Sequence, residues 1–324
     1  MSSLPLWAHG LIVLVTIGVV ALGAHWLVEA ASRIAKRFGV SELIIGLTIV
    51  AMGTAAPEFA VTLIAALRDQ GDISVGNIVG SNIFNLGFIL GGCAVVRAIP
   101  IGRTMLQRDG AVLGATTVLI GVLIGFDLEL DRHDGLLLCI LLVAYLAFLF
   151  KQRRKGIEEE PSPDTHAPEK GMSLWREGAA LLIGLLCIVA GSHLLVASAT
   201  AIARGFGVSE WVIGVTIVAA GTSAPELATS LVGVIKGRYA MSAGNVIGSD
   251  IFNLLGVLGL AGILRPMSVD SMARVSLAAL CGMVFLVIFF MRTGWRVSRL
   301  EGLALIAIAA SRWIVDLSAR GVGL

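Results

Sequence analysis

The chain has 324 residues, of which 57% are hydrophobic and 14% charged, and its formal net charge is only +2. A soluble domain carries about 25% charged residues, so this composition excludes a soluble fold and places most of the protein surface against lipid. The small and scattered positive charge also argues against a nucleic-acid partner.

Ten apolar runs are long enough to cross a hydrocarbon core about 30 Å thick, which takes about 20 residues in a helix. In chain order they cover residues 6–31, 41–67, 73–96, 105–126, 134–150, 177–203, 209–235, 241–264, 272–291 and 299–318. No basic segment precedes the first run, which is also longer than the apolar part of a cleavable signal, so we expect a spanning helix there. The runs predict an all-α polytopic membrane protein with ten transmembrane helices.

A polar segment from Lys151 to Ser173 separates the first five runs from the last five. It combines a basic cluster, an acidic cluster and three prolines, a composition that buries little surface. We therefore expect a solvated linker, in preference to a regulatory or lipid-binding segment. The predicted organisation is a first five-helix repeat over residues 1–150, the linker over 151–173, and a second five-helix repeat over 174–324.

The basic residues predict the orientation of the chain. Most of the 24 Lys and Arg residues fall on the side of the membrane that carries the linker. Because cytoplasmic loops are enriched in Lys and Arg, the linker is expected in the cytoplasm and both termini outside the cell membrane. Five spans is an odd number, so the second half must enter the membrane in the opposite sense to the first.

The sequence also repeats itself. Residues 39–58 align with residues 207–226 and are identical at most positions, and residues 76–86 align with residues 244–254 in the same register. Duplicated halves with an odd number of spans form inverted repeats, whose substrate sites lie near the midplane where interrupted helices meet. The repeated segments are therefore the expected location of the functional site.

Each copy of the repeat contains a helix break. Gly53 and Gly221 loosen the helix, and Pro57 and Pro225 cannot donate a hydrogen bond to the carbonyl group four residues earlier. This leaves carbonyl oxygens free at membrane depth. The predicted fold is thus two inverted five-helix repeats with broken helices at the midplane.

A carboxylate follows each proline, Glu58 in the first copy and Glu226 in the second. An intramembrane carboxylate is costly and is a functional candidate by default. Helical spacing and the next helix of each half add further oxygen donors: Ala51, Thr54, Thr62, Ser81 and Asn85, and Ala219, Thr222, Ser230, Ser249 and Asn253. Oxygen ligands without histidine or thiolate suit Ca²⁺ and Na⁺ and would not select zinc or copper.

The charge of these ligands favours an exchange of cations. Two carboxylates neutralise one Ca²⁺, and emptying the site forces protonation or replacement by other cations. Pairing of the two glutamates with a buried base is the less favoured interpretation, because neither repeat core contains Lys or Arg.

Several other polar residues favour structural roles. Glu42 and Glu210 begin helices, where capping and the helix dipole explain an acidic residue. His25, like its equivalent in the second half, is expected to pack or to form an interhelical hydrogen bond in preference to relaying protons. Glu29 and Arg33 are spaced for an i,i+4 ion pair. The four cysteines lack CxxC spacing, so neither disulfides nor a zinc site are expected.

The paired Gly-Thr-(Ala/Ser)-Ala-Pro-Glu and Gly-Ser-(Asn/Asp)-Ile-Phe-Asn motifs resemble the two alpha repeats of the sodium/calcium exchangers, in the cation/calcium antiporter superfamily, and especially its compact prokaryotic members. The resemblance implies alternating access in a cell membrane, with residues 6–31 and 177–203 sliding against a core, and no cofactor besides the transported ions. By resemblance, Glu58 and Glu226 are central calcium ligands helped by Thr54 and Thr222. The carbonyls of Ala51 and Ala219 would complete flanking sodium sites with Ser81, Ser249, Ser223 and Asn85.

The sequence departs from the family pattern at two places. Ala55 stands where the family usually places the serine that is retained here as Ser223. Asn253 occupies a place where some relatives carry an acidic residue, while Asp250, a possible additional ligand, lies three residues earlier. Both departures bear on ion stoichiometry and on sodium as the driving ion more than on calcium.

The leading hypothesis is a Na⁺/Ca²⁺ antiporter, and the nearest alternative is a proton-driven Ca²⁺ antiporter in which Glu58 or Glu226 alternates between calcium and protons. A cation channel is disfavoured, because two buried carboxylates would bind a divalent ion too firmly for rapid passage unless other ions compete. An intramembrane hydrolase is disfavoured as well, since the sequence has no Asp pair, Ser/His arrangement or HExxH motif. The expected partners are Ca²⁺, Na⁺ and the lipid bilayer.

Overall fold

A computed structural model describes residues 5–152, 173–207 and 219–319, and the side chains of Ala219 and of residues 315–319 lie outside what it describes. The first half consists of α1 (Leu6–Phe38), α2 (Glu42–Ile45), η1 (Gly46–Val50), α3 (Ala51–Thr54), α4 (Ala56–Leu67), α5 (Gly71–Phe84), η2 (Asn85–Leu90), α6 (Gly91–Val96), β1 (Ile99–Pro100), η3 (Met105–Gly110), α7 (Ala111–Asp127), β2 (Glu129–Leu130) and α8 (Arg132–Gln152). The segments labelled η are single π-helical turns.

The second half consists of α9 (Leu174–Gly205), α11 (Ala219–Thr222), α12 (Ala224–Ile235), α13 (Tyr239–Ile251), η6 (Phe252–Val257), α14 (Leu258–Leu264), β3 (Met267–Ser268), α15 (Met272–Arg292), β4 (Arg296–Val297) and α16 (Arg299–Ala319). Every predicted apolar run corresponds to a helical segment with similar bounds, although residues 208–218 of the seventh run and most of the linker lie outside the described residues. The prediction of an all-α membrane protein is confirmed.

Seven of the described helices are long and apolar enough to cross a membrane, and α2–α3 with α4 would form an eighth as a bent pair. The bend between the two parts is 51°. It lies at Ala55, whose ψ angle of 8° departs from helical geometry. Pro57 follows in the first turn of α4, where a missing N–H group is tolerated. The predicted break is therefore present.

The second copy breaks in the same manner. Ser223 has φ −88° and ψ 8°, close to the angles of Ala55, and Pro225 lies in the first turn of α12. Because the same local sequence gives the same break twice, the break is a property of the motif.

Two short antiparallel strand pairs connect the halves of the chain. β1 pairs with β4, and β2 pairs with β3, so each pair joins a loop of the first half to a loop of the second. α8 begins just after β2 and ends beside the linker, which places the β1–β4 pair at the end of the molecule that carries the linker. We call this end the linker end and the end with β2–β3 the opposite end.

The α5–α6 and α13–α14 segments form the buried centre of the protein. α13 approaches η1 very closely: a β-carbon at Gly248 would lie 2.6 Å from the Leu47 Cα, and one at Gly46 would lie 2.5 Å from the Met241 carbonyl oxygen. Only glycine permits this backbone contact. The contact packs α13 of the second half tightly against η1, which belongs to the broken helix of the first half.

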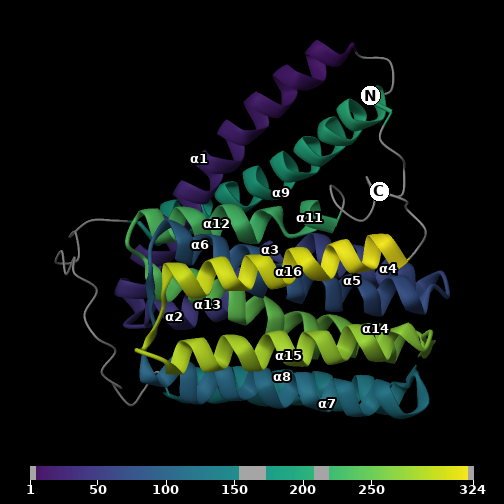
Figure 1. Cartoon of the computed structure of the whole chain (residues 1–324). Helices are drawn as coiled ribbons and strands as arrows, with labels where there is room; N and C mark the ends of the chain where they lie inside the picture. Colours follow the sequence, from purple (N-terminus) through teal and green to yellow (C-terminus); the bar gives the residue numbers. More distant parts are fainter. Residues whose placement is uncertain (1–4, 153–172, 208–218, 320–324) are drawn as a thin grey trace.

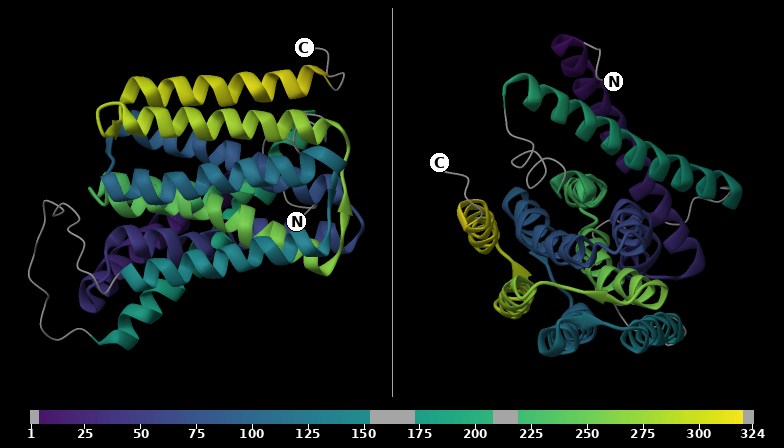
Figure 2. Two further views of the ribbon diagram at one scale, coloured as in Figure 1. Left: turned by 90° about the horizontal axis from the view of Figure 1, so that it is seen from below. Right: turned by 90° about the vertical axis from the view of Figure 1, so that its right-hand side faces the viewer.

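α1 and α9 lie side by side and slant away from the remaining helices (Figure 1). The two further views show the same arrangement, with the purple and teal helices crossing over one face of the bundle while the other long helices run nearly parallel (Figure 2). The fold is thus a bundle that contains the broken helices, with a separate helix pair across it.

Candidate ion-binding site

The two broken helices and the central helices α5 and α13 bring the predicted site residues together. Glu58 and Glu226 are both fully buried, with no exposed surface. Each lies in the first turn of its helix, α4 or α12. The positive end of the helix dipole favours a negative charge in this position. Each break therefore supplies a buried carboxylate together with the electrostatic environment that stabilises it.

An asparagine of the following helix fixes each broken segment. Asn77 Nδ2 donates to Thr62 Oγ1 at 3.0 Å and to the Glu58 carbonyl oxygen at 3.3 Å. In the second half Asn245 Nδ2 donates to Ser230 Oγ at 2.9 Å and to the Glu226 carbonyl oxygen at 3.4 Å. Sequence reasoning missed both asparagines, although each directly follows a glycine in the repeated motif.

Polar contacts also cross between the halves. Ser223 Oγ donates to Glu58 Oε1 at 2.8 Å. Ser249 Oγ donates to the Ala51 carbonyl oxygen at 3.4 Å, and Thr54 Oγ1 lies 3.3 Å from Asn245 Oδ1. The site is therefore built jointly by both repeats.

A cluster of buried side chains joins α5–η2 to α13–η6. Asn85 Nδ2 donates to Asp250 Oδ1 at 2.9 Å, and the equivalent contact in the other half is Asn253 Nδ2 to Asn82 Oδ1 at 3.1 Å. Asn82 Nδ2 also donates to the Asp250 carbonyl oxygen at 3.2 Å. All four residues are completely buried. The two contacts are the same except that one contains a carboxylate where the other contains an amide.

Many oxygen atoms of this region have no hydrogen-bond donor among the described residues. They are Glu58 Oε2, both carboxylate oxygens of Glu226, Asp250 Oδ2, Asn85 Oδ1 and Asn253 Oδ1. A buried acceptor without a partner is unfavourable and rare in folded proteins. A hard cation bound to carboxylate and amide oxygens would satisfy them. The donor set therefore fits Ca²⁺ and Na⁺.

Carboxylates alone do not make a metal site here. Within the described ranges, no group of three or more His, Cys, Asp or Glu side chains is placed to hold a metal ion. Any cation bound between Glu58 and Glu226 therefore needs hydroxyl, amide and backbone oxygens as well, which the flanking residues provide.

The remaining predicted residues differ in how far they are buried. Thr54 and Ser249 are fully buried, Ser81 is buried in α5, and Thr222 is half-buried at the end of α11. Ala219 begins α11, and its side chain lies outside the described part of the chain. Hydrogen bonds thus bring together predicted residues of both halves, namely Ala51, Thr54, Glu58, Asn85, Ser223, Ser249, Asp250 and Asn253, and add Asn77, Asn82 and Asn245.

The sequence profile of the family described as sodium/calcium exchanger protein matches residues 8–151 and again residues 178–311. The chain belongs to the sodium/calcium exchanger family. The family assignment predicted from the paired motifs is therefore confirmed. As a member of this exchanger family the protein is a calcium/cation antiporter, with the transported ions as its ligands.

Similar proteins cover most of the exchanger. The inner membrane protein YrbG of Escherichia coli strain K12 is 38% identical over 261 residues, covering 79% of each chain. The sodium/calcium exchanger MaX1 of Methanosarcina acetivorans is 32% identical over 334 residues, covering 91% of this chain and 94% of MaX1. A structure of the sodium-calcium exchanger NCX_Mj soaked with zero Na⁺ and Ca²⁺ superimposes with a TM-score of 0.81 at 29% identity, covering 97% of this chain and 99% of that one.

Proposed function

We propose that this antiporter exchanges Ca²⁺ for Na⁺ at a site centred on Glu58 and Glu226. The observation that carries the proposal is the pair of fully buried carboxylates at equivalent helix breaks, with three of their four oxygens lacking a hydrogen-bond donor among the described residues. Such a pair neutralises one divalent cation. Thr54 and Thr222 would add oxygens to the calcium site.

The flanking ligands would hold sodium. In this proposal the carbonyls of Ala51 and Ala219, together with Ser81, Ser249, Ser223 and Asn85, line the sodium positions. Asn253 and Asp250 extend the ligand set through their unpaired oxygens. Na⁺ and Ca²⁺ both accept such oxygen ligands, so sodium can replace calcium without a change of donor type.

Exchange follows from the charge of the site. When Ca²⁺ leaves, Glu58 and Glu226 remain buried without a countercharge, which is strongly unfavourable in a low-dielectric interior. The empty site therefore resists reorientation until other cations enter. Release of one ion is therefore coupled to binding of the other.

Sodium is favoured as the driving ion by the names of two similar proteins, MaX1 and NCX_Mj, both described as sodium/calcium exchangers. A proton-driven mechanism is the second candidate. It is favoured by Glu226, both of whose carboxylate oxygens lack a donor among the described residues, since a proton would satisfy one of them.

We also propose that residues 1–150 and 174–324 form the two repeats in the cell membrane, that the linker is cytoplasmic and that both termini lie outside. The distribution of Lys and Arg supports this orientation, and the similarity to an inner membrane protein supports the location.

Uptake of ⁴⁵Ca²⁺ into proteoliposomes tests the counter-ion. Vesicles loaded with sodium are compared with potassium-loaded vesicles at equal pH, and with potassium-loaded vesicles that carry an acid interior. The proposal expects rapid uptake only into the sodium-loaded vesicles. Uptake that follows the pH gradient and ignores sodium would establish the proton-driven alternative.

A further inference from the structure

α1 and α9 pack against each other as a separate helix pair. At their crossing a β-carbon at Gly23 would lie 2.8 Å from the Gly184 carbonyl oxygen, and one at Gly184 would lie 2.8 Å from the Gly23 carbonyl oxygen. The two backbones are therefore in direct contact, as in small-residue helix pairs of membrane proteins. The pair slants across the bundle as one body (Figure 1).

This pair covers the two helix breaks. A β-carbon at Gly53 would lie 3.0 Å from Leu185 Cδ2 of α9, and Val196 of α9 fills the space beside Gly221. Each glycine directly precedes a threonine of the candidate ion site. Side chains of α9 thus contact both helix breaks, and a shift of the pair would uncover them.

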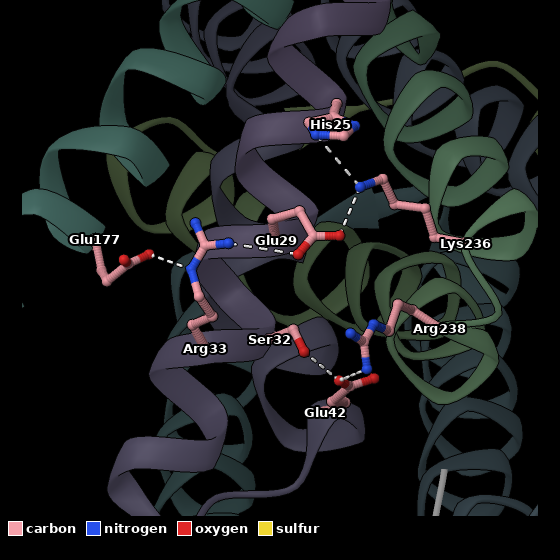
Figure 3. A network of polar contacts seen from close by, with 8 residues as sticks. All are labelled: His25, Glu29, Ser32, Arg33, Glu42, Glu177, Lys236 and Arg238. Atoms are coloured by element: carbon pink, nitrogen blue, oxygen red, sulfur yellow. Dashed lines mark hydrogen bonds and ion pairs between the residues drawn. The ribbon is translucent and has the colours of Figure 1, made fainter. Parts of the chain in front are cut away.

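A polar network gathers at the linker end of the pair (Figure 3). Arg33 of α1 pairs through Nε with Glu177 Oε2 in the first turn of α9 at 2.8 Å. The same guanidinium lies 3.4 Å from Glu29 Oε2, which confirms the predicted i,i+4 pair. These contacts hold α1 and α9 together at this end.

Other contacts of the network fasten the pair to the bundle. Glu29 Oε1 pairs with Lys236 Nζ, directly after α12, at 2.5 Å. Ser32 donates a hydrogen bond to Glu42 at the start of α2, and Glu42 also pairs with Arg238 Nη1 at 3.0 Å. α1 is thereby attached to segments of both halves. Glu42 was predicted as a helix-start residue, and the structure adds this bridging contact.

The network is partly shielded from water. Ser32 is 1% exposed, and the side chains of Glu42, Arg238, Lys236 and Glu29 are 11%, 16%, 19% and 28% exposed. His25, one turn before Glu29, lies with Nε2 3.5 Å from Lys236 Nζ, an interhelical contact of the predicted kind. Ion pairs with this degree of burial are screened less by salt than exposed pairs.

The repeat shows that the second half lacks the residues of the Glu29–Lys236 pair. Because the halves are inverted, the residues equivalent to Glu29 and Arg33 belong to the opposite end, and they are Ala197 and Ala201. The counterpart of Lys236 is Arg68, so a cation remains there without the carboxylate on the helix. The second half therefore cannot reproduce the Glu29–Lys236 pair.

We infer that the Glu29–Lys236 and Ser32–Glu42 contacts form a latch that closes the linker end of the ion pathway and regulates which side of the membrane the site faces. The inference rests on the proposed function of the site as an antiport site, which must open to the two sides in turn. Contacts that exist in one state only stabilise that state. The latch must break each time ions are exchanged with the linker side.

A cysteine reporter tests the latch without measuring transport. Val232 lies one turn before Lys236 on α12 and packs against a cluster that contains Leu27, Val28 and Ala31 of α1. In a chain whose four native cysteines are replaced by alanine, Val232→Cys is labelled with a membrane-impermeant maleimide in nanodiscs. Val232 is half-buried in this structure, and movement of α1 away from α12 exposes it further, so a rise in the labelling rate reports opening of the linker end.

The latch variants Glu29→Gln and Ser32→Ala are expected to label about fivefold faster than the parent or more, the lower end of typical coupling between two states. The control Asp69→Asn removes an ion pair of 2.5 Å with Arg265 at the opposite end and is expected to leave the rate unchanged.

Equal labelling rates in the parent and both latch variants would overturn the inference. If Glu29→Gln does not fold, Ser32→Ala makes the same comparison by removing only a hydroxyl. Absence of sodium-driven uptake by the wild-type protein would refute sodium as the counter-ion. The labelling rates test the latch independently of that result.

Discussion

Ser223 Oγ donates a 2.8 Å hydrogen bond to Glu58 Oε1, and this contact has no counterpart in the other half of the site. At the equivalent position the chain carries Ala55, which is fully buried and has no hydroxyl to offer Glu226. Both Glu226 oxygens accordingly lack a donor among the described residues. The two carboxylates are related by sequence, but their environments differ.

This asymmetry predicts the effect of Ala55→Ser. A new hydroxyl supplies a neutral oxygen, on which a monovalent ion depends more than Ca²⁺ does. We expect the sodium concentration that displaces half of the bound ⁴⁵Ca²⁺ to fall by about threefold or more, consistent with one added polar interaction, with little change in calcium affinity. Ser223→Ala, the matched variant, is expected to shift the curve the other way. Coincident curves for Ala55→Ser and wild type would exclude Ala55 from a sodium site and favour proton-driven exchange.

Asp250 predicts a change in sodium cooperativity. With Glu58, Glu226 and Asp250 charged, Ca²⁺ leaves one negative charge uncompensated, whereas three monovalent ions neutralise the site. In Asp250→Asn the site is neutral with Ca²⁺ alone. We expect the Hill coefficient for sodium inhibition of ⁴⁵Ca²⁺ binding to fall by about one, because one fewer cation is required. An unaltered coefficient in Asp250→Asn would remove Asp250 from the ion site.

The contact between α13 and η1 predicts the effect of Gly248→Ala. The added β-carbon would lie 2.6 Å from backbone atoms of Leu47, which can move only if a helix shifts. Overpacking of this kind costs roughly 1–3 kcal/mol, so the melting temperature in detergent should fall. Gly282→Ala, in α15, adds a methyl group with no described atom within 4 Å and should leave the melting temperature nearly unchanged. Equal melting temperatures would show that the close contact does not stabilise the fold.

The linker predicts the membrane orientation. Asp164 lies in the linker, outside the described residues. In a chain without its native cysteines, Asp164→Cys should react with an impermeant thiol reagent only after the cytoplasmic side is exposed, because the basic residues place the linker inside. Gly125→Cys, at the end of α7 near the opposite end, should react from outside. Reaction of Asp164→Cys in intact cells would reverse the proposed orientation.

Much of this fold can be predicted from the sequence because membrane helices leave simple signals. A long apolar run has few alternatives to a spanning helix, and Pro57 and Pro225 break their helices wherever the chain is placed. The repeated motif likewise identifies Glu58 and Glu226, since a carboxylate in such a segment requires a functional reason.

Contacts between distant segments could not be predicted in this way. The Ser223–Glu58 hydrogen bond and the Glu29–Lys236 ion pair depend on how the two halves pack together. The local sequence of one half does not show which residues of the other half lie beside it. Asn77 and Asn245 were missed for a different reason: neutral amides are unremarkable in sequence until their acceptors are known. The repeat nevertheless contained the signal, because both occupy the same place in the two copies.

The most direct test of the central claim is sodium-driven ⁴⁵Ca²⁺ uptake by Glu58→Gln and Glu226→Gln. Glutamine keeps the volume of the side chain and removes the charge that neutralises Ca²⁺. We predict that each variant is folded and inserted but takes up no more calcium than protein-free vesicles, while Glu129→Gln, at the exposed first residue of β2, transports normally. Calcium uptake by either site variant at the wild-type rate would contradict the assignment of these two carboxylates as the central ligands.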